Sequence, residues 1–298
     1  MMLKNLKPNK IKWNKSQLIE SDNYIRVFIK SLSPHFGPSE RQKIYFISKL
    51  FVDGTVEVGQ NRFELADHFF NRGEFFLNKM EDGSIMKMML INIYDRSKSL
   101  YFYKLGEHEK AIGLINNALQ INGKLEAQGF SFMAFDRFSQ YHNLSKIYFS
   151  KNEPEKGIAV LSDVISFLMT AKPNSHVDSI PNFLETLDAD GVSMRSSLLC
   201  MLLFETIGKF QLEKDGAIFM ERSDPFFSKI LDSSINFLLL SKTDHYIKQW
   251  VMLMEHFYRK DFKRFKIESL TYLKTEQTFY GNTPSILLRQ YLDYVDAF

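Results

Sequence analysis

The stretch from Asn92 to Lys124 constrains the fold most, because it carries two helical patterns on either side of Gly106. In its second half, apolar residues recur at three- and four-residue steps, which is the period of one helix face. Gly106 has the backbone freedom to end the first helix, and Gly123 is expected to close the second. The stretch therefore predicts two antiparallel helices folded at Leu105-Gly106-Glu107. A lone hairpin of this kind cannot bury both of its faces, so it needs neighbours.

A second hairpin is predicted from Phe138 onward, with its turn at Asn152-Glu153-Pro154. Pro154 suits the first turn of a helix, where the missing N–H is not needed. The small residues Ala111 and Gly157 hold equivalent places in the two hairpins, 46 residues apart. A similar spacing, of 45 residues between Ala66 and Ala111, places Ala66 in an earlier and more degenerate copy.

Residues 92–168 resemble the tetratricopeptide repeat, a helix-turn-helix unit of about 34 residues. In the first hairpin, Asp95 and Lys98 depart from the family pattern, which usually has large apolar residues there. The resemblance implies an all-α fold of antiparallel helical hairpins stacked as a right-handed solenoid. The residues that match the family's small, aromatic, turn and packing positions are Ser99, Phe102, Gly106, Ala111, Ile115 and Ala118 in the first hairpin, and Tyr141, Leu144, Ser145, Tyr148, Gly157, Leu161 and Val164 in the second.

Composition shifts and turn signals divide the chain into four predicted parts. They are a basic N-terminal arm with short helices (1–45), repeat-like helices (46–170), a loop or linker rich in Pro, Asn and Asp (171–192), and further degenerate helical repeats with a C-terminal capping helix (193–298). The first repeat-like helix is expected at Glu40–Val52, capped by Ser39 and interrupted at Asp53-Gly54. Later helices are expected at Phe63–Leu77, Ile85–Leu105, Ser193–Gly208, Phe226–Leu240 with its entry at Asp224-Pro225, His245–Arg259, Asp261–Leu273 and Pro284–Phe298.

The composition narrows the range of partners and compartments. A net charge of +3 is too mild to indicate a nucleic-acid partner. A single cysteine, Cys200, excludes an intramolecular disulfide and suits a reducing, cytoplasmic setting. No apolar run is long enough to form a transmembrane segment. A homodimer is compatible with these features and stays open.

Patterns that indicate catalysis are absent from the sequence. The seven histidines are scattered, and no pair has the spacing of a helical zinc site, so we expect no metal and no cofactor. The segment Phe257–Lys266 interleaves aromatic and basic residues, which suits either nucleic-acid binding or, as we expect, core aromatics on a solvated helix.

The resemblance also implies a binding surface, because the first helix of each repeat lines a concave groove in that family. Carried over by position, the groove residues are Ile93, Arg96, Ser97, Leu100, Tyr103 and Lys104 in the first hairpin, and Ser139, His142, Asn143, Lys146, Phe149 and Ser150 in the second. Our candidate peptide-binding residues are Arg96, Tyr103, Lys104, His142, Asn143, Lys146 and Phe149. The amide of Asn143 could pair with a peptide backbone, and the basic side chains could attract acidic segments.

Three functional hypotheses follow from these observations. The first is a non-catalytic scaffold or adaptor that binds a protein or peptide in its groove. The second is a peptide-sensing bacterial regulator resembling quorum-sensing receptors built from similar repeats. The third is an all-helical enzyme whose residues converge only in the folded chain.

Overall fold

The computed structural model describes residues 32–178, 187–210, 216–274 and 283–296, together with Phe28, Ile180, Phe183 and Leu184. Every regular element in these ranges is helical, which confirms the predicted all-α class for this part of the chain. Most of the arm expected at 1–45 lies outside the described residues. The helices are α2 (Pro38–Gly59), α3 (Phe63–Leu77), α4 (Ile85–Lys104), α5 (His108–Ala127), α6 (Met133–Ser150), α7 (Pro154–Thr170), α8 (Ala189–Phe210), α9 (Gly216–Ser234), α10 (Lys242–Tyr258), α11 (Phe262–Lys274) and α12 (Thr283–Asp296).

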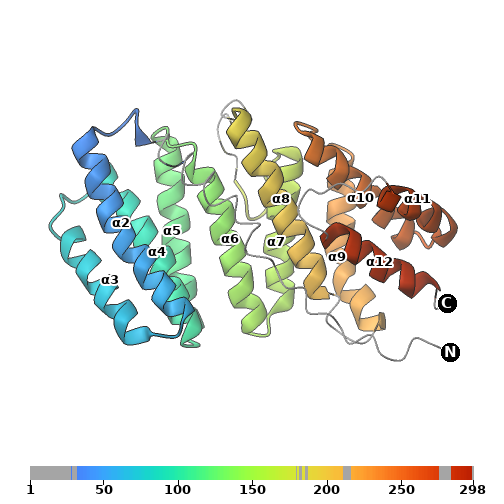
Figure 1. Ribbon diagram of the computed structural model, residues 1–298, viewed down its shortest axis with the longest axis horizontal. Helices are drawn as coiled ribbons and strands as arrows, with labels where there is room; N and C mark the ends of the chain where they lie inside the picture. Colours follow the sequence, from blue (N-terminus) through green and yellow to red (C-terminus); the bar gives the residue numbers. More distant parts are fainter. Residues whose placement is uncertain are drawn as a thin grey trace.

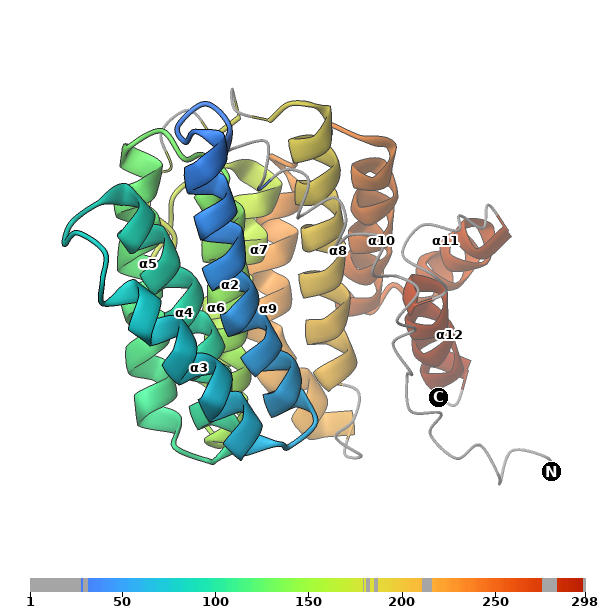
Figure 2. The ribbon, with the colours of Figure 1, turned by 60° about the vertical axis from the view of Figure 1, so that its left-hand side comes forward.

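Consecutive helices pack as neighbouring pairs. The pairs α2/α3, α4/α5, α6/α7 and α10/α11 each have extensive contacts, and α2 also packs on α4 while α5 packs on α6. The helices follow one another along the long axis of the molecule, from α3 at one end to α11 at the other (Figure 1). Turning the molecule shows α11 and α12 projecting beside the body formed by the longer helices (Figure 2). This pairing is compatible with a helical repeat.

The predicted turns lie where the local chemistry requires them. Gly106 has a φ of 78°, a conformation that glycine adopts without steric cost, and it follows the end of α4. Asn152 takes a φ of 61° before Pro154 opens α7. Ser84 caps α4 by accepting a hydrogen bond from the Lys87 amide at 3.3 Å. The turns at Gly106 and Asn152 agree with the sequence prediction.

The predicted interruption at Asp53-Gly54 is wrong, because α2 continues through both residues to Gly59. Gly54 instead permits a close helix crossing: a Cβ added there would lie 2.7 Å from a ring carbon of Phe70 on α3. Gly73 on α3 similarly receives the ring of Phe51 from α2. The two glycines and two phenylalanines therefore interlock the first hairpin.

Other predicted boundaries also differ in the structure; the helix expected at Phe226–Leu240 is α9, which ends at Ser234. The α2 helix is preceded by Gly37, whose amide donates to the Glu40 carboxylate at 2.9 Å, so Ser39 is not the cap. Gly123 lies inside α5, which ends at Ala127. Pro225 lies within α9 and does not mark its entry.

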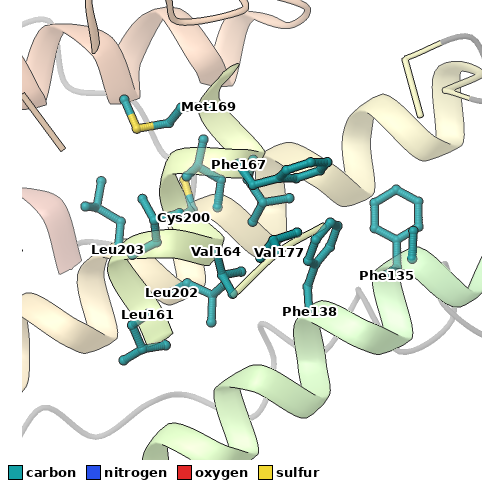
Figure 3. Close-up of a cluster of buried hydrophobic side chains, with 14 of the residues drawn as sticks. Phe135, Phe138, Leu161, Val164, Phe167, Met169, Val177, Cys200, Leu202 and Leu203 are labelled. Carbon is teal, nitrogen blue, oxygen red and sulfur yellow. The ribbon is translucent and has the colours of Figure 1, made fainter. Parts of the chain in front are cut away.

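The hydrophobic core is continuous from the first hairpin to α12. In its middle, Phe138 of α6, Phe167 of α7 and Cys200 of α8 converge with Val177 from the segment between α7 and α8 (Figure 3). Cys200 is fully buried, as expected of a cysteine in an apolar run. A smaller cluster joins α5, α6 and α7 around Ile115 and Leu144.

The segment expected to be a loop or linker at 171–192 contributes to this core through Val177, Ile180 and Phe183. Beyond it, a buried ion pair links α8 to α10: Arg195 Nη1 donates to Asp244 Oδ2 at 3.0 Å, and both side chains are inaccessible. Arg195 Nε also donates to the Leu168 carbonyl at the end of α7 at 2.8 Å. The α7 helix thus contacts both α8 and α9, on the far side of the predicted boundary.

Among the described residues, no helix is both long and apolar enough to cross a membrane.

Candidate functional site: a groove along α2, α4 and α6

Three helices that each begin a hairpin, α2, α4 and α6, run in the same direction because α3 and α5 return the chain between them (Figure 1). Two cavities lie along these helices. The larger, of about 600 Å³, lies between their N-terminal halves, and the smaller, of about 380 Å³, lies between their C-terminal halves. Both cavities are lined by Val52 and Arg96. We refer to the two cavities together as the α2–α4–α6 groove.

The smaller cavity brings together four of the seven candidate peptide-binding residues. Arg96 and Tyr103 reach it from α4, and Asn143 and Lys146 reach it from α6. Ser97, Leu100 and Ser139, which the repeat register also assigned to the groove, line the same cavity. Residues of two hairpins, 36 or more positions apart in sequence, therefore share one surface.

The other three candidates lie outside both cavities. Lys104 is exposed at the end of α4. His142 is buried and faces α8, where its Nε2 lies 2.8 Å from a carboxylate oxygen of Glu205. Phe149 packs on the hairpin's own second helix, since a Cβ added at Gly157 would lie 3.0 Å from its ring. The structure thus places His142 and Phe149 in contacts between helices.

The sequence did not predict the larger cavity, which is mainly apolar. Its walls include Leu32, Ile44, Tyr45, Met89, Ile93 and Phe132. Of these, only Ile93 belongs to the positions that the repeat register assigned to the groove. The α2 side of this cavity escaped prediction because helix α2 was expected to break at Asp53-Gly54, which left its register undefined.

A chain of buried polar groups fixes Arg96 at the junction of the two cavities. The Arg96 guanidinium donates to Asp136, whose side chain is only 1% exposed. Asn122 donates to the other Asp136 oxygen at 3.1 Å, and Asn92 donates to Asn122 at 2.7 Å. Because these partners are buried, the guanidinium is held in place at this junction.

The charges along the groove are mainly positive. Arg41, Lys49, Arg96 and Lys146 line one or both cavities, and Lys49 is paired with Asp53 at 2.8 Å. Asp136 is the one carboxylate among the described lining residues, and it is already paired with Arg96. The groove therefore has the electrostatic character to attract an acidic ligand.

Two other features from the sequence can be located. Phe257 and Phe265 of the aromatic and basic segment are buried, while Arg259, Lys260, Lys263 and Arg264 are exposed, as expected of core aromatics on a solvated helix. Within the described ranges, no three His, Cys, Asp or Glu side chains are grouped so as to hold a metal ion.

Comparison with known proteins adds no family assignment: no family model matches this sequence, and no curated protein matches it either.

Proposed function

We propose that this chain is a non-catalytic, cytoplasmic scaffold of tetratricopeptide-like hairpins, stacked as a right-handed solenoid, that binds a peptide segment of a partner in the α2–α4–α6 groove. The observation that supports the proposal most is the convergence at the smaller cavity. Seven of the twelve positions that the repeat register assigned to a groove line this one cavity.

The chemistry of the smaller cavity suits a peptide backbone with acidic side chains. Asn143 offers an amide that can both donate and accept, and Lys146 makes no ion pair with the described residues. Tyr103 and Leu100 supply apolar surface beside them. An adaptor and a peptide-sensing regulator would use this groove in the same way, so one experiment tests the binding that both require.

The experiment selects peptides from a phage-displayed library of random twelve-residue sequences on the immobilised full-length chain. Selected peptides are then synthesised and their affinities measured for the wild type and for Asn143→Ala combined with Lys146→Ala. We expect the double variant to bind about tenfold or more weakly, because it loses a charge-assisted contact and an amide pair.

The matched control combines Asn116→Ala with Lys124→Ala, which removes the same two residue types from exposed positions of α5 outside both cavities. It should leave affinity unchanged. A library that yields no binding peptide, or peptides that bind both double variants equally, would contradict the proposal.

A further inference from the structure

The larger cavity has the size and composition of a side-chain binding site. Its volume of about 600 Å³ falls within the range of small-ligand pockets, about 300–1,000 Å³. Ile44 and Met89 form a buried floor, being 1% exposed each, so the cavity wall is fixed by the core. A bulky apolar side chain entering it would contact side chains that are already ordered.

The α2 side of the cavity leaves apolar surface in contact with solvent. Tyr45 and Val52 both line the cavity, yet they are 65% and 48% exposed. They lie on one face of α2, seven residues apart, with Lys49 between them. Covering such a patch is favourable, because it removes apolar surface from water.

Two residues that line the larger cavity carry a buried polar atom without a described hydrogen-bond partner. Asn92 is fully buried and its Nδ2 donates to Asn122 and to the Ala118 carbonyl, but its Oδ1 has no partner among the described residues. Ser48 Oγ on the facing helix α2 is likewise buried without a described partner. A buried polar atom without a hydrogen bond is unfavourable.

Cations lie on both sides of the apolar region. Arg41, in the first turn of α2, lines the larger cavity. Arg96 and Lys146 lie toward the smaller cavity. An apolar side chain in the larger cavity would therefore have positive charge on either side of it.

Building on the function proposed above, we propose that the larger cavity is an anchor site for one bulky aromatic or aliphatic side chain of the bound peptide, with Asp or Glu residues on both sides of it. The length of the groove sets the length of the segment. From Met89 to Tyr103 along α4 the helix rises about 21 Å, at 1.5 Å per residue. An extended peptide spans that distance with about six residues, at about 3.3 Å each.

The test uses the same phage-displayed random library, selected on the full-length wild type and then titrated on two tryptophan variants. Val52→Trp places a large ring at the junction of the cavities, at a position exposed enough to accept it. Leu65→Trp is the control, because Leu65 is 41% exposed on α3, and no described residue of α3 lines either cavity. Thermal unfolding of both variants verifies that the fold is intact.

We expect the selected peptides to share a bulky apolar residue with Asp or Glu within about three positions on either side, the spacing that the groove length allows. Val52→Trp should weaken their binding by tenfold or more, and Leu65→Trp should not. Arg41→Glu should also weaken binding, whereas Lys43→Glu, at an exposed position of α2 outside the cavities, should not.

Two results would overturn the anchor site and leave the peptide groove standing: selected peptides without a shared apolar residue, or peptides insensitive to Val52→Trp but sensitive to loss of Asn143 and Lys146. Sedimentation gives a third: a wild-type dimer that Val52→Trp dissociates would assign the cavity to a second copy of the chain. A library that yields no binding peptide would overturn both proposals together.

Discussion

Asp95 is a carboxylic acid at a position where the resemblance to the tetratricopeptide repeat predicts a large apolar residue. Its side chain is 4% exposed and accepts a hydrogen bond from Asn117 Nδ2 of α5 at 2.6 Å. Burial raises the pKa of Asp95 from 3.8 to about 6, and the hydrogen bond from Asn117 offsets only part of that rise. The second departure, Lys98, bonds to Asp67 of α3 at 2.8 Å. Both residues replace apolar packing by polar links between helices.

The raised pKa of Asp95 makes stability depend on pH in a defined direction. Between about pH 4 and 6 the folded chain keeps a proton that the unfolded chain releases, so this group's contribution to stability falls as pH rises. Above pH 6 the buried carboxylate is ionised and costs roughly 3 kcal/mol at most, at about 1.4 kcal/mol per tenfold change in acidity. Asp95→Asn, which keeps an oxygen for Asn117, should therefore stabilise the protein at pH 7.5 and have little effect at pH 4.

Urea unfolding of the wild type and Asp95→Asn at several pH values measures this difference. Asp232→Asn, at an exposed position of α9, is the control and should change little at any pH. A stabilisation by Asp95→Asn that is equally large at pH 4 and pH 7.5 would show that the effect does not come from ionisation.

At the scale of helices, the two glycines of the first hairpin act as packing residues. Alanine normally stabilises a helix by about 1 kcal/mol relative to glycine. At Gly73 the added methyl would collide with the ring of Phe51, which is fully buried and has no room to retreat. We expect Gly73→Ala to destabilise the protein by about 1–3 kcal/mol, as overpacking usually does.

Gly113 supplies the matched control, since it lies inside α5 and an added Cβ would meet nothing within 4 Å. Gly113→Ala should raise the free energy of unfolding by about 0.5–1 kcal/mol. Chemical denaturation of both variants gives the comparison. If both alanines stabilise, the interlock between α2 and α3 is looser than the structure indicates.

The first hairpin also illustrates why some elements could be predicted from the sequence and others could not. Phe63–Leu77 was predicted with both ends correct, because its apolar period and its flanking residues are local signals. Gly54 was misread as a break, since its role depends on Phe70, a residue of another helix. The buried pair of Arg195 and Asp244 was missed for the same reason, although Ser241-Lys-Thr-Asp244 has the spacing of a capping box. Local sequence signals therefore predict where helices lie, whereas contacts with residues distant in sequence cannot be predicted from them.

At the scale of the molecule, the two cavities of the groove differ in how far the sequence could predict them. The smaller cavity contains residues that the repeat register could assign, because Arg96, Tyr103, Asn143 and Lys146 belong to the two hairpins with clear patterns. The larger cavity depends on α2 and on the start of α6, where Phe132 and Met133 precede the recognisable pattern. The repeat pattern therefore predicts the smaller cavity, which its hairpins cover, and does not predict the larger one.

The continuous core makes a prediction about the two halves of the chain on either side of residues 171–192. The α7 helix packs on both α8 and α9, and Leu238 N donates to the Met169 carbonyl at 2.8 Å. A linker between independent domains would show few such contacts. We therefore expect helices α2–α7 and α8–α12 to unfold in one transition.

Trp250 provides a probe for the C-terminal half, because it is fully buried between Phe204, at a ring distance of 5.0 Å, and the Pro284 carbonyl, which accepts its Nε1–H at 3.3 Å. Trp13→Phe removes the other tryptophan of the chain, so that fluorescence reports α10 alone. The midpoint of urea unfolding measured by this fluorescence should equal the midpoint measured by far-ultraviolet circular dichroism, which reports all helices. Adding Asp95→Asn, a change in α4, should shift both midpoints together at pH 7.5. Separate midpoints, or a shift of the dichroism signal alone, would mean that the two halves fold independently and that residues 171–192 act as a linker.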